Sequence, residues 1–285
     1  MKSKKLKLLL IAAGVLIFST TGLFVGQKYF VQAQSSNQLE YLPAAKPDIN
    51  RNKVANHSGK DKSPMQVKTN PGTPTIYDFS TETVGAMPVT FAPAVGNWIT
   101  GIDKDNKVLV VDGRKWRRGQ PSSSLADKAR ALYGERYAEF LDNVKAYAYY
   151  PFAVAQLTKN FTAGEITVRF KAIAGRIDQG AGILFDLKTN GDYYAIRANP
   201  LENNLVLWRF KQGRRSSVSW VRNVPTASRK WHELQVKIDK KLVKGYVNGK
   251  HYLTFKLSEP VSGKVGLWTK ADSVIYFDDY TIVTK

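Results

Sequence analysis

Polar and aromatic side chains gather in the stretch 193–204, YYAIRANPLENN. Successive side chains of a β-strand point to opposite faces, so Tyr193, Arg197 and Asn199 would share one face. A guanidinium and an amide that can bond hydroxyl groups, beside an aromatic platform, are the groups that a sugar ring needs. The same residues can instead form a sheet-surface cluster in which Arg197 pairs with Glu202, and the sequence leaves both interpretations open.

A second group, Arg176, Asp178 and Gln179, comes directly before an apolar stretch that is typical of a buried strand. Asp178 could be a catalytic carboxylate, or it could orient Arg176 or Arg197. The alternative is a loop ion pair that only stabilises the turn.

A third group, Trp268, Lys270 and Asp272, lies near the C-terminus in GLWTKADS. Trp268 and Lys270 alternate onto one face, which could stack on a sugar or meet an anionic group, and Asp272 follows in a turn. Otherwise Trp268 is a core residue and Lys270 pairs with Asp272.

A fourth group lies on two strands that the KQGRRSS turn could join into a hairpin. Trp208 and Trp220 would lie across that hairpin from each other, with Arg214 and Arg215 beside them. Exposed together, these residues would form an aromatic and basic patch suited to acidic polysaccharide. Buried, the two tryptophans would simply belong to the core.

The sequence offers few residues for binding a metal ion and none for cysteine chemistry. The chain of 285 residues has no cysteine and only three histidines, His57, His232 and His251. This excludes disulfides, thiolate metal sites and a cysteine nucleophile, and we expect no cofactor. Asp103, Asp105 and Asn106 carry oxygen ligands in one loop and could hold Ca²⁺. A polar hairpin turn is the other interpretation, because Lys104 and Lys107 oppose a cation.

The N-terminus predicts export. Four lysines within the first seven residues precede an apolar run at 8–26, and Val31 and Ala33 suit a cleavage site, so residues 1–33 read as a secretory signal. Retention of the run as a membrane anchor is the rival interpretation. We therefore expect an extracytoplasmic protein, secreted, periplasmic or anchored by residues 8–26, that meets the membrane only through this segment.

The charge is strongly basic. The whole chain carries 43 lysines and arginines against 23 acidic residues, a net charge of +20. This charge can simply give a well-solvated basic surface. The more specific interpretation is attraction to anionic envelope polymers. Nucleic acid is not an expected partner, because no recognition motif accompanies the charge. The oligomeric state stays open.

The remaining sequence divides into a tether and a domain. Residues 34–74 are polar and rich in proline, which predicts a disordered linker. From residue 75 to 285, short alternating stretches separated by Gly, Asn and Asp predict an all-β antiparallel sandwich, with two-residue hairpin turns at Asn190-Gly191 and Asn248-Gly249. One helical insertion is expected at about 125–145, where apolar residues follow a helical stripe.

Three segments carry a resemblance to a known family: GRIDQGAGILFDLKTNGDYYAIRANPLENNLVLWRFKQGRRSSV (175–218), WHELQVKIDKKLVKGYVNGKHYLTF (231–255) and GKVGLWTKADSVIYFDDYTIV (263–283). They resemble concanavalin A-like (laminin G-like) jelly rolls, and within these the bacterial 3-keto-disaccharide hydrolases, described as glycoside hydrolase family 16-like. The resemblance implies a two-sheet jelly roll whose concave face takes a sugar. Family 16 glucanases carry paired glutamates in an E-x-D-x-x-E run, which this chain lacks.

The primary hypothesis is therefore a carbohydrate-binding module that recognises envelope or environmental glycan. Its expected binding residues are Arg176, Gln179, Tyr193, Arg197, Asn199, Trp208, Arg215, Trp268, Lys270 and Asp272. A glycoside hydrolase acting on 3-keto-disaccharides is the second hypothesis, with Asp178 and Glu202 as candidate carboxylates. A structural domain of the cell envelope without a small ligand is the third.

Overall fold

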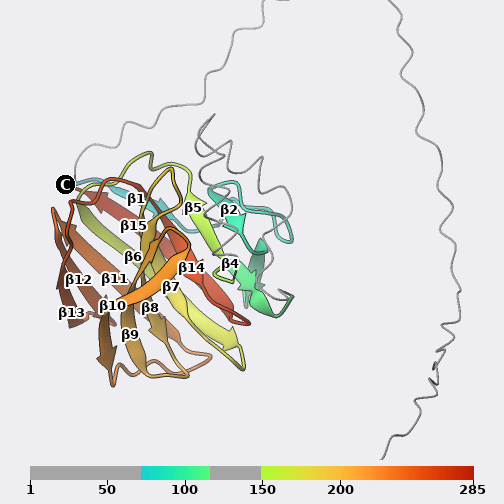
Figure 1. Ribbon diagram of the computed structural model, residues 1–285. Helices are drawn as coiled ribbons and strands as arrows, with labels where there is room; N and C mark the ends of the chain where they lie inside the picture. Colours follow the sequence, from blue (N-terminus) through green and yellow to red (C-terminus); the bar gives the residue numbers. More distant parts are fainter. Residues whose placement is uncertain (1–71, 116–148) are drawn as a thin grey trace, which may run out of the picture. The chain divides into compact units, whose positions relative to one another are not determined.

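The computed structural model describes residues 72–115 and 149–285 (Figure 1). These residues form fifteen strands and one short 3-10 helix, Gly113–Lys115. The strands build two antiparallel sheets, which confirms the prediction of an all-β sandwich. The expected signal or anchor, nearly all of the expected linker and the expected helix at 125–145 lie outside the described residues. Within those residues there is no α-helix, and hence none with the length and apolar character needed to cross a bilayer.

One sheet has eight strands, of which seven follow one another edge to edge and β1 pairs separately with β15. In spatial order they are β13 (Lys250–Lys256), β12 (Leu242–Val247), β11 (Trp231–Asp239), β6 (Gly164–Ala174), β15 (Val274–Thr284), β4 (Asn106–Asp112) and β3 (Trp98–Asp103), with β1 (Pro74–Tyr77) beside β15. This sheet contains the N-terminal and C-terminal strands of the described part.

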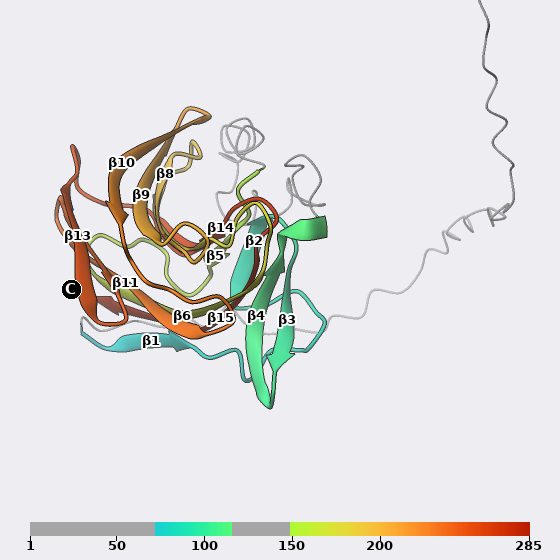
Figure 2. The same cartoon turned by 90° about the horizontal axis from the view of Figure 1, so that it is seen from below.

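The other sheet has seven strands and forms the second layer, seen beside the first in Figure 2. Its order is β10 (Arg214–Arg222), β9 (Asn204–Lys211), β8 (Tyr193–Asn199), β7 (Ala181–Leu187), β14 (Lys264–Thr269), β5 (Phe152–Ala155) and β2 (Phe91–Val95). Strands β7 to β10 follow one another in sequence and in space, so successive hairpins build this half of the sheet.

The hydrophobic core lies between the two sheets and follows from the alternation of the strands. In β11, Leu234, Val236 and Ile238 are buried, while the residues between them are only half-buried. From the opposite sheet, Ile196 and Leu207 belong to the same buried cluster. Burial of these apolar faces is the main favourable contribution to the free energy of folding.

The two predicted hairpin turns have different outcomes. Asn248 and Gly249 have φ values of 49° and 74° and join β12 to β13 directly, as the prediction of a two-residue turn requires. The prediction at Asn190-Gly191 is wrong, because only Gly191 has a positive φ, 82°. There the Gly191 N–H donates to the Lys188 carbonyl over 3.0 Å and the Lys188 N–H donates to the Asp192 carbonyl over 2.8 Å. These bonds close a longer loop, in which glycine supplies the one left-handed residue.

Two strands, β2 and β5, differ from the alternating stretches on which the prediction of the sandwich depends. Every residue of FAPAV in β2 and of FAVA in β5 is buried, so neither strand shows the alternation that reveals a half-exposed strand. β2 is an edge strand, which is where a proline such as Pro93 is tolerated.

Truncation of Leu234 to alanine tests this account of the core. Leu234 is 0% exposed and Leu242, on the neighbouring strand β12, is 37% exposed. We expect Leu234→Ala to lower the free energy of unfolding by about 2–5 kcal/mol, because it leaves a cavity between the sheets. Leu242→Ala, the matched control, should lower it by less than about 1 kcal/mol. Urea denaturation measures both, and equal losses would contradict this placement of the core.

Candidate functional site

The face of the seven-stranded sheet that points away from the core carries the predicted site. Along β8, Tyr193, Arg197 and Asn199 lie on this outer face, while Ile196 and Ala198 between them join the core, so the three share a face as expected. Their cross-strand partners on β9 are Phe210 for Tyr193, Val206 for Arg197 and Asn204 for Asn199. The hairpin register therefore places aromatic side chains at one end of the face and polar ones at the other.

Asp178 and Arg197 form a buried charge cluster at the polar end. Asp178 is 0% exposed and Arg197 1% exposed. Asp178 Oδ2 lies 2.6 Å from Lys270 Nζ, and its Oδ1 lies 3.6 Å from Arg197 Nη1 and accepts a bond from Asn199 Nδ2 over 3.1 Å. Asp178 therefore orients Arg197, one of the two roles expected for it. Lys270 pairs with Asp178 and not with Asp272, which corrects the expected pair.

Glu202 and Asn204 hold the opposite edge of Arg197. Arg197 Nη2 donates to Glu202 Oε2 over 3.1 Å and to Asn204 Oδ1 over 3.2 Å. Asn204 Nδ2 in turn donates to Glu202 Oε2 over 2.8 Å. The expected Arg197–Glu202 pair is thus present, and it links the buried cluster to the β8–β9 turn.

Asp272 stabilises the loop that carries Asp178. Its carboxylate accepts backbone N–H bonds from Arg176 over 2.8 Å and from Ile177 and Asp178 over 3.0 Å each. Burial raises the pKa of Asp272, but these three bonds outweigh that effect and hold the pKa below its usual value. The side chain of Arg176 is exposed.

Two neighbours complete this loop. Gln179 is buried; its Nε2 donates to the Gly175 carbonyl over 3.1 Å and its Oε1 accepts a bond from the Ser228 hydroxyl. Gln179 therefore has a structural partner at each end of its amide. Position 180 has no room for a side chain, because a Cβ there would lie 2.6 Å from Arg197 Cδ and 2.8 Å from Asp178 Oδ1.

The aromatic end of the outer face is packed. Trp268 is 0% exposed, its Nε1 donates to the Tyr193 hydroxyl over 3.2 Å, and its ring stacks on Tyr150 with 5.7 Å between centroids. Gly182 leaves the space that this indole occupies, since a Cβ there would lie 3.1 Å from the ring. Trp268 and Tyr193 are core residues of this face, so the expectation that they form an open sugar platform is wrong.

The β9–β10 hairpin brings Trp208 and Trp220 together, as expected, with 5.6 Å between ring centroids. Trp208 is 7% exposed and Trp220 48% exposed. The guanidinium of Arg215 lies 4.2 Å above the Trp208 ring and 5.1 Å from that of Tyr150. The exposed arginine therefore covers the buried tryptophan, while Trp220 presents its ring to solvent.

An open hollow of about 490 Å³ lies beside Trp220, at the end of the sheet where the charge cluster lies. Its lining is Glu202, Asn203, Asn204, Trp220, Arg222 and Asn223. Of these, Arg222 and Asn223 were not among the expected site residues, because they end an edge strand and belong to no motif. The sequence signal that could have found Arg222 is its position in the β9–β10 hairpin, whose register pairs it with Asn204.

Glu202 is ionised in this setting. Burial raises its pKa, but the bond from Asn204 and the charge of Arg197 outweigh burial, so the pKa lies below its ordinary value. A general acid for glycoside cleavage needs the opposite shift. Glu202 is therefore suited to accept hydrogen bonds from a ligand and not to donate a proton.

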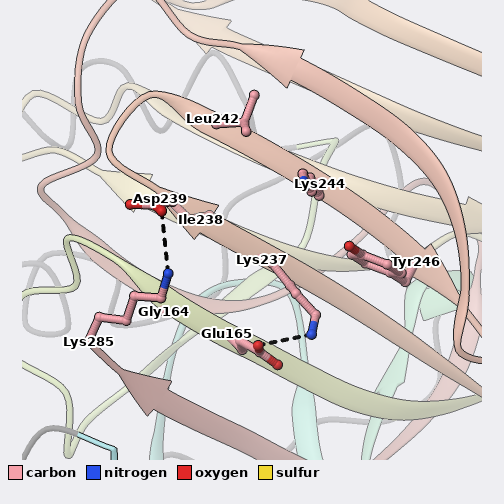
Figure 3. Close-up of a pocket in the computed structure, with 9 residues that line it drawn as sticks. All are labelled: Gly164, Glu165, Lys237, Ile238, Asp239, Leu242, Lys244, Tyr246 and Lys285. Carbon is pink, nitrogen blue, oxygen red and sulfur yellow. Dashed lines mark hydrogen bonds and ion pairs between the residues drawn. The ribbon is translucent and has the colours of Figure 1, made fainter.

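A second hollow, of about 170 Å³, lies on the outer face of the eight-stranded sheet (Figure 3). Its charges are largely matched: Lys237 lies 2.9 Å from Glu165, and Lys285 lies 3.4 Å from Asp239. Tyr246 supplies the aromatic ring, and Lys237 lies 5.4 Å from its centroid.

The expected calcium loop is a hairpin turn. Asp103 pairs with Asn106 across it, and the Asp103 carboxylate binds Lys171 Nζ at 2.6 and 2.7 Å and Trp231 Nε1 at 3.0 Å. In the part of the chain that the structure describes, no cluster of three His, Cys, Asp or Glu side chains could hold a metal ion.

Comparison with known proteins gives structural neighbours only. No protein-family model and no curated protein matches the chain. The carbohydrate-binding module CBM66 from Bacillus subtilis is similar at 11% identity and TM-score 0.48, covering 70% of this chain and 98% of that one. A native glycosidic hydrolase is similar at 15% identity and TM-score 0.46, covering 75% and 97%. A Bacillus subtilis protein of unknown function with a galectin-like fold is similar at 11% identity and TM-score 0.42, covering 74% and 98%.

Neutralisation of Asp272 tests the loop anchor. Because the native pKa of Asp272 is lowered, its charge stabilises the fold above the ordinary carboxyl pKa, and this contribution is lost as the pH falls through the native value. We expect Asp272→Asn to lower the free energy of unfolding by about 1–2 kcal/mol at pH 7, since the bonds to a charged acceptor are replaced by neutral ones. The deficit should vanish below the native pKa.

Denaturation at a series of pH values measures this difference. Asp105→Asn, in the exposed β3–β4 turn, removes the same charge without touching the loop and is the matched control. A deficit for Asp272→Asn that stays constant with pH would show that the carboxylate charge is not what holds the loop.

Proposed function

We propose that this protein binds glycan in the hollow beside Trp220. The observation that carries the proposal is the half-exposed indole of Trp220, 48% accessible, bordering a hollow lined with carboxamide and carboxylate groups. The C–H face of a sugar ring packs on an indole. The exposed side chains of Glu202, Asn203 and Asn223 provide donors and acceptors for the hydroxyl groups around that ring.

The walls of the hollow are held in place before any ligand arrives. Glu202 and Asn204 bond to each other and to Arg197, whose own position is set by Asp178. A site whose polar groups are already oriented loses less conformational entropy on binding. The buried cluster beneath the hollow therefore supports affinity by keeping Glu202 and Asn204 oriented.

Binding is better supported than hydrolysis of 3-keto-disaccharides. The solvent-reachable carboxylate, Glu202, has a lowered pKa, whereas acid catalysis calls for a raised one. Asp178 is fully buried and engaged by Lys270, Arg197 and Asn199.

The basic start and apolar run of residues 1–33 further suggest that the module works outside the cytoplasmic membrane, either released or anchored.

Removal of the indole tests the proposal. The purified protein is screened on an array of neutral and acidic oligosaccharides, and the strongest ligand is titrated by calorimetry. We expect Trp220→Ala to weaken that ligand about ten-fold or more, because the stacking surface is lost. Tyr246→Ala, which removes an aromatic ring from the hollow of the other sheet, should leave the affinity unchanged.

The proposal fails if no oligosaccharide binds. It fails equally if Trp220→Ala binds the selected ligand as tightly as the unmodified protein does, or if Tyr246→Ala is the variant that loses binding.

A further inference from the structure

Among the described residues, three buried donors on the outer face of the seven-stranded sheet have no hydrogen-bond acceptor. They are Arg197 Nε, Trp208 Nε1 and Arg197 Nη1, whose ion-pair contact with Asp178 Oδ1, at 3.6 Å, is too long for a hydrogen bond. Arg197 is 1% and Trp208 7% exposed, and the guanidinium carbon lies 6.0 Å from the Trp208 ring centroid. A buried polar group without a partner is costly, so these groups indicate a missing acceptor. All three are donors, so a protonated amine, which only donates, does not meet the need.

The local charge points in the same direction. Four cations at this end of the sheet, Arg197, Arg215, Arg222 and Lys270, stand against three carboxylates, Asp178, Glu202 and Asp272, which leaves one positive charge in excess. A hydroxyl group or water could accept the hydrogen bonds, but only an anion would also neutralise that charge. A carboxylate does both, and its two oxygens can reach more than one donor.

An exposed side chain covers the Trp208 ring. Arg215 covers Trp208 through its guanidinium, 4.2 Å from the ring, and is itself exposed to solvent. An arginine held by ring contacts at the surface exchanges rotamers readily. Turning Arg215 away uncovers Trp208, and turning it back places its guanidinium over whatever has entered.

We propose that the glycan is acidic, and that a uronic acid carboxylate binds Arg197 and Trp208 beneath Arg215. This inference rests on the proposed function, because the neighbouring sugar of the oligosaccharide stacks on Trp220. The ring centroids of Trp208 and Trp220 are 5.6 Å apart. The uronate is the specificity-determining unit, and the hollow holds its neighbour.

The experiment compares a trigalacturonate with its fully methyl-esterified form, which keeps the ring and removes the charge. Calorimetry with the unmodified protein should show the acid binding about ten-fold more tightly, as expected for a charged acceptor on buried donors. Inorganic phosphate at the same concentration should not compete, because it lacks the ring that stacks on Trp220.

Two conservative variants locate the preference. Trp208→Phe keeps an aromatic ring but removes the donor, and Arg215→Gln removes the covering charge; each should reduce the acid-over-ester preference to about three-fold. Lys244→Gln removes the same charge from the outer face of the other sheet and should leave the preference intact. In the unmodified protein, nuclear magnetic resonance should show the Trp208 indole N–H and Arg197 Nε–H signals shifting with the acid and not with the ester.

Each contrary result has a distinct meaning. Equal affinity for acid and ester, with both lost in Trp220→Ala, overturns the uronate inference and leaves glycan binding standing. A preference that Lys244→Gln weakens as much as Arg215→Gln does reflects general basic charge and also overturns it. Failure of the acid to bind, or Trp208 and Arg197 signals that do not shift with the acid, rejects the uronate inference directly. The array of neutral oligosaccharides tests the proposed function separately.

Discussion

The contact between Asp178 and Arg197 is the constraint on which the polar end of the seven-stranded sheet depends. Both groups are almost fully buried, and a buried charge is tolerated only when it is paired and hydrogen-bonded. Removing one partner of such a pair typically costs about 3–5 kcal/mol, because the other charge stays buried alone. Through this pair the loop before β7, the strand β8, the β8–β9 turn and the end of β14 hold one another in position.

This constraint also decides where a ligand can bind. The aromatic part of the outer face is filled by its own side chains, with Trp268 and Tyr193 bonded to each other. The polar part is open at its edge, where Glu202 and Asn204 line the hollow with Trp220. Glu202 and Asn204 bond to the buried Arg197 and also line the open hollow, so the rigidity of the cluster sets the geometry of the hollow.

The sequence predicted the strands well where one face is half-exposed and poorly where both faces are buried. Leu234, Val236 and Ile238 alternate with polar residues and mark β11 clearly, whereas the uniformly apolar β2 and β5 show no period. The same reasoning applies to the site. The continuous apolar run of β7, AGILFDL, was a signal that the outer face is covered, because a face open to water usually alternates.

The candidate residues were grouped correctly where β-strand periodicity applies and incorrectly where long-range packing decides. The shared face of Tyr193, Arg197 and Asn199 follows from a period of two. The pairing of Lys270 with Asp178, 92 positions apart in sequence, depends on how β14 lies beside β7, which a single sequence does not encode locally. The hollow was missed for the same reason, since it joins a turn to the end of an edge strand.

A crystal structure of the protein with a bound oligosaccharide tests the central claim most directly. The account predicts a sugar ring lying on the indole of Trp220, with its hydroxyl groups bonded to Glu202 and Asn203, and with the Asp178–Arg197 contact unchanged. A sugar bound on the outer face of the eight-stranded sheet, or one that binds only after the Asp178–Arg197 pair has separated, would contradict it.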